Sequence, residues 1–278
     1  MKIENNPLKQ YFRRPAIYLR LPSAGVGYKP GVLNIPESGE LPVYPMTAID
    51  EITARTPDAL FNGVAVVNII KSCIPDILDP WSITSQDLDA VLIAIKSAAN
   101  GNEMEIITTC PACTEESKYD VNLVAVLSTL KGADYTKELQ LQDLQFKFRP
   151  LNYREMQEIN STQFEFQRIL ATIDDITTGS EEERVARSQE ALKNITEITM
   201  RTLATTIEHI RTPTVFVDDT NYILDFLRNC DRSMFITIRD HVAELRASTE
   251  IKPLEVKCIH CTHEYKQPFT LNMSDFFG

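Results

Sequence analysis

Two short cysteine pairs, far apart in the chain, restrict the possible fold more than any other feature of the sequence. The first stands in Cys110-Pro111-Ala112-Cys113 and the second in Cys258-Ile259-His260-Cys261. Each pair has the spacing of a zinc knuckle, in which two thiolates from one tight turn hold the same metal ion. Together they supply the four thiolates of a closed tetrahedral site. We therefore expect one structural zinc site with Cys110, Cys113, Cys258 and Cys261 as its ligands.

The residues around the two pairs match as well. Cys-Thr-Glu-Glu-Ser-Lys begins at Cys113, and Cys-Thr-His-Glu-Tyr-Lys begins at Cys261. Short strand-like runs flank both pairs, at residues 104–109 and 119–123 and at residues 254–257 and 269–271. This pattern predicts a zinc ribbon that is split into two distant halves. Because such a site leaves no coordination position open, the metal would serve architecture and not catalysis.

Three alternatives to this zinc site remain open on the sequence. A Cys-Pro-x-Cys run can be a redox dithiol, although a redox pair does not need a second matching copy. The two pairs could be unrelated and bind no metal. His260 or His263 could replace one of the cysteines as a ligand. The remaining cysteines, Cys73 and Cys230, lie in apolar helical contexts where plain burial is expected.

Composition and charge exclude several classes of function. The net charge is −11 at pH 7, whereas nucleic-acid-binding surfaces are basic, so we expect no nucleic-acid partner. No stretch approaches the roughly 20 apolar residues of a membrane span, and the N-terminus lacks the apolar core of a signal peptide. Six cysteines, four of them in closely spaced pairs, suit a reducing cytoplasm. These features predict a soluble globular protein.

The N-terminal region differs from the rest of the chain. Residues 1–46 hold seven of the fifteen prolines and four of the nine glycines, and the charged residues between Asn5 and Pro36 are all basic. Such a segment predicts an extended arm that docks onto an acidic neighbour. The alternative is a solvated tail whose charge has no role.

The predicted fold class is α+β, with a mainly helical body and a small β zinc ribbon assembled from the two distant knuckles. We assign residues 1–46 to the basic arm and residues 47–103 to an N-terminal helical region. Residues 104–124 and 251–278 form the split ribbon, and residues 125–250 form a mostly helical insertion. Within the insertion, residues 144–148 alternate like a strand, and residues 181–211 predict the longest helix. Helix starts are expected at Thr47, which resembles a capping box with Asp50, and at Thr56-Pro57. Gly101 is expected to end the helix that precedes the first cysteine pair.

Catalytic motifs are missing from the sequence. It contains no P-loop, no dinucleotide-binding glycine motif, no nucleophile elbow and no His-Glu-x-x-His. Two carboxylate pairs, Asp174-Asp175 and Asp218-Asp219, fall at predicted helix ends, where capping or solvated aspartates are common. We therefore expect no enzymatic activity, and the residues alone indicate a structural or interaction protein.

One region carries a family resemblance. The run Leu-Pro-Val-Tyr-Pro-Met-Thr-Ala-Ile-Asp-Glu-Ile at residues 41–52 and Thr-Pro-Asp-Ala-Leu-Phe-Asn-Gly at residues 56–63 belong to it. So do residues 66–75, Asp79-Pro-Trp81, residues 87–95 and the run into Thr109-Cys-Pro-Ala-Cys113. These segments resemble the hub-type baseplate protein family of T-even-like contractile-tailed phages. The resemblance covers about residues 14–125 and leaves residues 150–250 unmatched.

The resemblance implies a structural component of the baseplate hub. Such a protein is made in the host cytoplasm, docks to other baseplate and tail proteins in an oligomeric assembly, and ends in the virion tail. The alternative is a transient assembly chaperone for the hub or the tape-measure protein that is not kept in the virion. A third possibility, an enzyme with a zinc-ribbon accessory, conflicts with the missing motifs.

Overall fold

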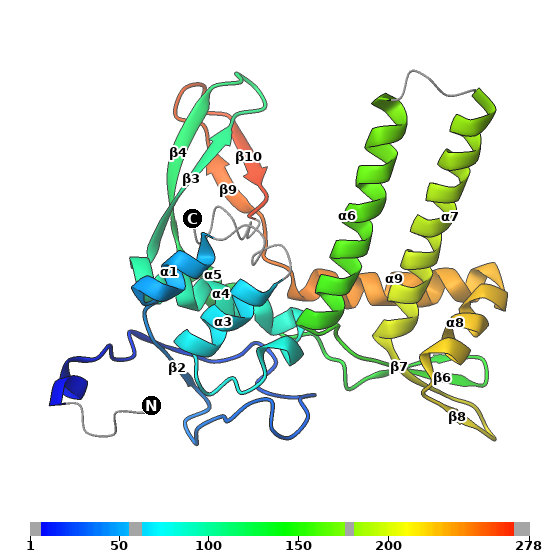
Figure 1. Cartoon of the computed structure of the whole chain (residues 1–278), viewed down its shortest axis with the longest axis horizontal. Coiled ribbons are helices and arrows are strands. Elements are labelled where there is room, and N and C mark those ends of the chain that lie inside the picture. Colours follow the sequence, from blue (N-terminus) through cyan, green and yellow to red (C-terminus); the bar gives the residue numbers. More distant parts are fainter. Residues whose placement is uncertain (1–6, 56–62, 176–180, 270–278) are drawn as a thin grey trace. The chain divides into compact units, whose positions relative to one another are not determined.

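The computed structural model describes residues 7–55, 63–175 and 181–269, which divide into two compact units (Figure 1). Unit 1 contains Met1–Pro80, Asp87–Lys131 and Glu250–Gly278, and unit 2 contains Trp81–Gln86 and Gly132–Thr249. Unit 1 holds both cysteine pairs, so its two distant halves fold together. None of the helices within the described residues combines the length and the apolar composition that crossing a membrane requires.

Unit 1 begins with the 3-10 turn η1 (Pro7–Tyr11) and a two-stranded antiparallel sheet. Strand β1 (Ile17–Leu19) pairs with β2 (Leu41–Val43), so that Ile17 lies opposite Val43. Leu19, Leu41 and Val43 are buried. The turns between the strands are fastened by Asp87, whose buried carboxylate accepts hydrogen bonds from the Ser23 N–H at 2.8 Å and from the Tyr28 hydroxyl at 2.8 Å. The proline-rich segment from residue 17 onward is therefore built into the unit.

The helices of unit 1 supply its core. They are α1 (Ala48–Ala54), α3 (Val64–Cys73), α4 (Ser85–Asn100), whose residues from Asp87 onward belong to this unit, and α5 (Leu123–Thr129); the 3-10 turn η2 (Pro80–Ser82) precedes α4. Thr47 and Asp50 form the expected capping box at the start of α1. Gly101, with a φ of 88°, follows the last residue of α4 as a left-handed helix terminator. The apolar faces of α3 and α4 are fully buried, including Ile69, Ile70, Val91, Leu92 and Ile95. The helix start expected at Thr56-Pro57 lies outside the described residues.

Two β-hairpins carry the cysteine pairs. Strand β3 (Glu103–Thr109) pairs with β4 (Glu116–Asn122), and β9 (Leu254–Lys257) pairs with β10 (Glu264–Gln267), both antiparallel. The strand that follows the second pair is Glu264–Gln267, which pairs with β9, and the strand expected at residues 269–271 falls mostly outside the described residues. Phe269 follows β10 and is buried, and residues 270 and 271 lie outside the described residues.

Unit 2 is built on a four-stranded antiparallel sheet in the order β5-β6-β7-β8. The strands are β5 (Glu138–Leu141), β6 (Leu144–Phe148), β7 (Ile207–Arg211) and β8 (Phe216–Val217), and the helices are α6 (Tyr153–Asp175), α7 (Glu181–Thr206), α8 (Thr220–Asn229) and α9 (Arg232–Thr249). Phe146 and Phe148 of β6 alternate onto the buried face, as period-2 patterning requires. They pack with residues of the sheet and helices, including Leu203, Ile210, Leu224 and Ile238. In unit 2, α6 and α7 stand as a long helical hairpin (Figure 1).

The helix expected over residues 181–211 ends earlier, at Thr206, and residues 207–211 form strand β7. Ile207 and Ile210 are both buried, and β7 pairs with β6 on one side and β8 on the other. Their three-residue spacing also fits a helix, so periodicity alone could not separate the two structures. The α+β class is confirmed. The prediction of a mainly helical body is not confirmed, because several small sheets accompany the helices.

Candidate metal centre

The four cysteines of the two pairs meet in one cluster. Their Sγ atoms all lie within 4.8 Å of one another. Two contacts join the two pairs: Cys110 to Cys261 at 3.6 Å and Cys113 to Cys258 at 3.6 Å. Tetrahedral zinc with bonds of about 2.3 Å to sulfur requires sulfur–sulfur distances of about 3.8 Å. The cluster therefore has the dimensions of a four-thiolate site, and the contacts are far longer than a disulfide bond of about 2.05 Å.

The two pairs adopt the same local backbone. The Thr114 N–H donates to the Cys110 carbonyl at 2.9 Å, and the Thr262 N–H donates to the Cys258 carbonyl at 3.0 Å. Both threonines are left-handed, with φ values of 61° and 62°, a conformation that is uncommon for a β-branched residue. The two matched Cys-Thr sequences thus form the same type of turn, and each turn places two thiols in the cluster.

Hydrogen bonds from side chains of the strands also join the two hairpins. The Thr108 hydroxyl donates to Gln267 Oε1 at 2.7 Å and lies 3.3 Å from the Tyr265 hydroxyl. The Tyr119 hydroxyl donates to the Lys257 carbonyl at 3.0 Å. These contacts connect residues more than a hundred positions apart, so the two hairpins lie side by side although they come from distant parts of the chain.

The thiols of the cluster influence one another. The backbone N–H of Cys261, followed by weaker contributions from other hydrogen bonds, lowers the pKa of Cys258 from 9.0 to about 6. The backbone N–H of Glu115 favours the thiolate of Cys113, but desolvation and hydrogen bonds with the other three thiols prevail and raise its pKa to about 12. Four thiolates this close repel one another, and a bound cation is what allows all of them to ionise.

The histidine side chains and the remaining cysteines are not members of the cluster, although the backbone N–H of His260 donates to Cys258 Sγ at 3.4 Å. The cluster consists of four cysteines, and the ring of His263 stacks on Tyr265 with centroids 6.2 Å apart. Cys73 is buried, and burial is the main reason that its pKa rises to about 12. Cys230 is half-buried, and desolvation raises its pKa as well. Each of these two is therefore a protonated thiol in the structure, as plain burial predicts.

The candidate carboxylate pairs do not form an active site in the described residues. Asp219 is the N-cap of α8 and accepts a hydrogen bond from the Asn221 N–H at 2.8 Å, which is a structural role. Asp174 and Asp175 end α6, and their side chains lie outside the described residues. Asp218 and Asp219 line neither the cavity nor the groove described next.

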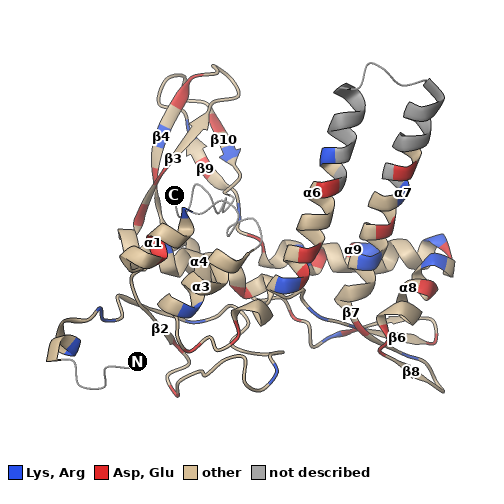
Figure 2. Ribbon diagram, in the orientation of Figure 1, with Lys and Arg blue, Asp and Glu red and all other residues tan. Residues whose placement is uncertain are grey.

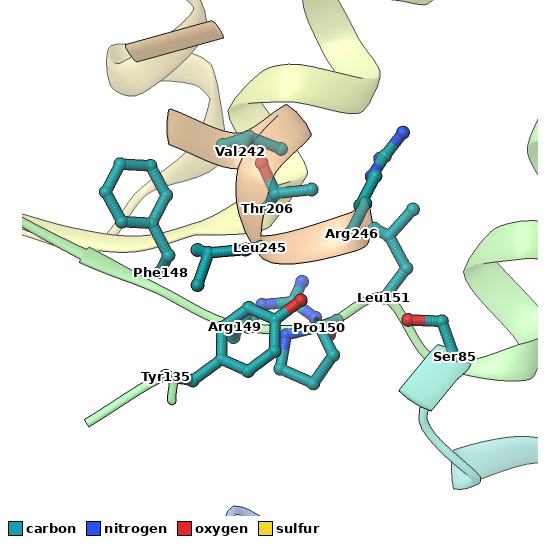
Figure 3. A pocket seen from close by; sticks show the side chains of 10 residues that line it. All are labelled: Ser85, Tyr135, Phe148, Arg149, Pro150, Leu151, Thr206, Val242, Leu245 and Arg246. Carbon is teal, nitrogen blue, oxygen red and sulfur yellow. Dashed lines mark hydrogen bonds between the residues drawn. The ribbon is translucent and has the colours of Figure 1, made fainter. Parts of the chain in front are cut away.

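Each unit has a hollow among its described residues. In unit 2 a cavity of about 10 Å³ lies among residues 148–151, the α9 residues Val242, Leu245 and Arg246, and the side chains of Ser85, Tyr135 and Thr206 (Figure 3). This volume is about that of one water molecule and too small for a substrate. In unit 1 a groove of about 550 Å³ runs between β4, α5 and the segment from Ile251 to Lys257. Its walls include the apolar side chains of Ile106, Val121, Val126, Leu254 and Val256.

Sequence reasoning missed the polar contacts that hold the N-terminal segment. Arg13 Nη2 donates to the Ser72 carbonyl at 2.8 Å and to Ser72 Oγ at 2.9 Å, and its Nη1 lies 3.5 Å from Asp50 Oδ2. Asp87 binds Ser23 and Tyr28 in the same unit. The partners are 37 to 64 positions apart, so local sequence contains no signal for their pairing. The Thr47/Asp50 capping box was the one part of this network with a sequence signature.

A comparison with known families matches the chain over most of its length. The model of the T4 bacteriophage base plate protein family covers residues 35–278, which includes both cysteine pairs and the whole of the helical segment that had no visible resemblance. No curated protein and no solved structure matches the chain. The family also indicates a protein of the virion tail with a structural rather than a catalytic role, which interacts with other phage tail proteins. Because the match spans far more than half of the sequence, the chain belongs to the T4 bacteriophage base plate protein family.

Proposed function

We propose that this protein is a structural component of the baseplate hub that docks to neighbouring tail proteins while the contractile tail is assembled. The observation that carries the proposal is the family match over residues 35–278. The protein is made in the host cytoplasm and becomes part of the tail within an oligomeric assembly. It requires neither nucleic acid nor a membrane as a partner, and it is not an enzyme.

A single zinc ion bound by Cys110, Cys113, Cys258 and Cys261 serves this role as an architectural clamp. The support is chemical: four soft sulfur ligands lie at tetrahedral spacing and leave no position for a substrate. The ion joins the two β-hairpins. It thereby closes a loop that contains all residues between 113 and 258. The baseplate subunit can then carry a large insertion without losing the geometry of its ribbon.

The four segments defined on the sequence receive separate roles in this proposal. Residues 1–46 provide the docking arm, and residues 47–103 provide the helical support of the ribbon. Residues 104–124 and 251–278 form the ribbon, and residues 125–250 form an insertion that presents a second contact surface. The contacts from Arg13 onward tie most of the arm to the body, so the docking portion is the segment before Arg13.

A second candidate, a transient assembly chaperone for the hub or the tape-measure protein, is favoured by the groove in unit 1. With about 550 Å³ and apolar walls on β4, α5 and β9, the groove has room for several side chains of an amphipathic helix. A chaperone would hold such a helix and release it, whereas a baseplate subunit would keep the groove filled in the finished tail.

Peptide mass spectrometry of purified virions separates the two candidates. A fixed copy number relative to a known tail protein is the expected result for a baseplate subunit. If the chain is absent from virions and yet required for tails to form, the hub component is excluded and the chaperone is supported.

A further inference from the structure

The segment that precedes β1 exposes three large apolar side chains. The turn η1 contains no buried residue, and a further turn brings the Phe12 N–H to the Lys9 carbonyl at 3.1 Å. The side chains of Leu8, Tyr11 and Phe12 are 58%, 77% and 55% exposed. Single exposed apolar residues are ordinary, but an aromatic pair beside a leucine on one short turn is typical of an interface anchor.

The residue that follows this apolar turn is held firmly by the body of unit 1. Arg13 follows Phe12 directly, and its guanidinium is bound by Ser72 and Asp50 and also donates to the Pro45 carbonyl. It further lies 5.9 Å from the centre of the Tyr44 ring. Because the next residue along the chain is held by both α1 and α3, little additional freedom is lost when the turn binds a partner.

The outer face of α1 is a second exposed apolar surface of the same unit. The helix buries Asp50 and Ala54, while Ile49 and Ile52 on the opposite side are 75% and 69% exposed. These isoleucines are three residues apart and therefore lie next to each other on the helix surface. Glu51 stands beside them and is also exposed.

The arm and the rest of the chain have opposite net charges. Residues 1–46 contain six basic and three acidic residues, a net charge of +3, so the remaining residues carry −14 of the total of −11. Lys9 and Arg14 border the apolar turn, whereas the exposed Glu51 and Arg55 both border the isoleucines of α1. Figure 2 shows the positive charge on η1 and acidic residues on α1. The arm of one chain would be repelled by another arm and attracted to an acidic body. The attraction therefore comes from the net negative charge of the body and not from the α1 face alone.

We propose that the occupant of the α1 face is the arm of a second copy of this chain, with Leu8, Tyr11 and Phe12 packed on Ile49 and Ile52. The contact is head-to-tail, because the donor and acceptor surfaces differ, and repetition of it builds a ring or a filament of subunits. This inference rests on the proposed docking function of the arm and names the neighbour to which the arm docks.

The test uses the full chain with its metal, in sedimentation velocity experiments over a range of concentrations. The arm variant carries Tyr11→Ser and Phe12→Ser, and the α1 variant carries Ile49→Gln and Ile52→Gln. All four positions are exposed, so the thermal midpoint of each variant should match that of the wild type. The matched control is Tyr222→Ser, which removes an exposed aromatic ring from unit 2.

We expect the wild type and the control to self-associate, and each variant to do so about tenfold or more weakly, as loss of central apolar anchors implies. An equimolar mixture of the two variants should form dimers and no larger species. The intact arm of the α1 variant can bind the intact α1 face of the arm variant, and no second contact can then form. A wild type that stays monomeric up to millimolar concentration overturns the proposal, as does self-association that both variants retain.

Failure of this inference is distinguishable from failure of the proposed function. If the wild type is monomeric but the arm variant still cannot support tail formation in infected cells, the arm docks to a different protein and the self-contact is rejected. If the chain is absent from virions, the hub component is rejected whatever its state of association.

Discussion

The Sγ atoms of Cys113 and Cys258 lie 3.6 Å apart although the two residues are 145 positions apart in the chain. With Cys110 and Cys261 they close a loop that contains all but six residues of unit 2 and only two short parts of unit 1, residues 114–131 and 250–257. Cross-linking so long a loop removes a large share of the freedom of the unfolded chain, and the entropy model gives about 4 to 5 kcal/mol for a loop of about a hundred residues. A metal ion bound by these four cysteines would therefore stabilise the fold more than an ion that closes a short loop.

Replacing Cys110 with Ser should remove stoichiometric metal and lower the free energy of unfolding by about 3 kcal/mol or more, because three thiolates and a hydroxyl hold zinc poorly and the loop is no longer closed. Elemental analysis of the purified protein and chemical denaturation measure the two effects. Cys230→Ser, at a half-buried position outside the cluster, is the control. Unchanged zinc content in Cys110→Ser would eliminate the shared site.

The buried carboxylate of Asp87 should be a strong determinant of stability in unit 1. In Asp87→Ala the Ser23 N–H, the Ser23 hydroxyl and the Tyr28 hydroxyl lose their acceptor. Leaving such groups unpaired in the interior costs about 2 to 4 kcal/mol. Asp76→Ala, which breaks a single exposed hydrogen bond to Asn34, should cost less than about 1 kcal/mol. Urea denaturation of both variants checks this, and equal losses would contradict the role of Asp87.

Several local features were predictable because the interactions behind them are local. The repeated Cys-x-x-Cys spacing predicted which four residues come together, the Thr47/Asp50 capping box predicted the start of α1, and Gly101 predicted the end of α4. The alternation of Leu144, Phe146 and Phe148 predicted β6. Each of these signals depends on residues within a few positions of one another, or on a motif that is recognisable by itself.

The remaining features depend on partners that sequence patterns do not reveal. Ile207 and Ile210 fit a helix and a strand equally well, and pairing with β6 decides for the strand. The contacts of Arg13 with Ser72 and of Asp87 with Ser23 join polar residues 59 and 64 positions apart. The visible family resemblance ended near residue 125, whereas the family match extends to residue 278.

Asp89 should make the protein less stable as the pH rises from about 4 to about 6. Burial first, and then the charge of Glu250, raise the pKa of Asp89 from 3.8 to about 6. Between these values the folded protein keeps a proton that the unfolded chain has released, so folding loses free energy as the pH increases. Asp89→Asn should remove this loss and be about 2 kcal/mol more stable than the wild type at pH 7.

Urea denaturation of both proteins at pH 4.5 and pH 7 gives the comparison for Asp89. The difference between variant and wild type should grow with pH. A difference that is the same at both values would show that Asp89 titrates normally in the folded protein.

Two phenylalanines of the same sheet should respond very differently to truncation. Phe146 is fully buried in the core of unit 2, whereas Phe216 lies on the edge strand β8 and is half exposed. Phe146→Ala should destabilise the protein by about 3 to 5 kcal/mol through lost burial and a cavity. Phe216→Ala should change the free energy of unfolding by less than about 1 kcal/mol. Denaturation curves of similar size for the two variants would contradict this account of the sheet.

Removal of residues 1–12 should leave the fold intact and block tail assembly. A longer deletion through residue 45 would also remove the buried Leu19, Leu41 and Val43 and the partners of Asp87, and would therefore confuse unfolding with loss of docking. The shorter deletion stops before Arg13, so the contacts to Ser72 and Asp50 remain. The variant should unfold within about 1 kcal/mol of the wild type. In infected cells that lack the natural gene, counts of complete tails by electron microscopy should fall sharply. Normal numbers of tails would reject the N-terminal segment as a docking element and leave the helical insertion as the contact surface.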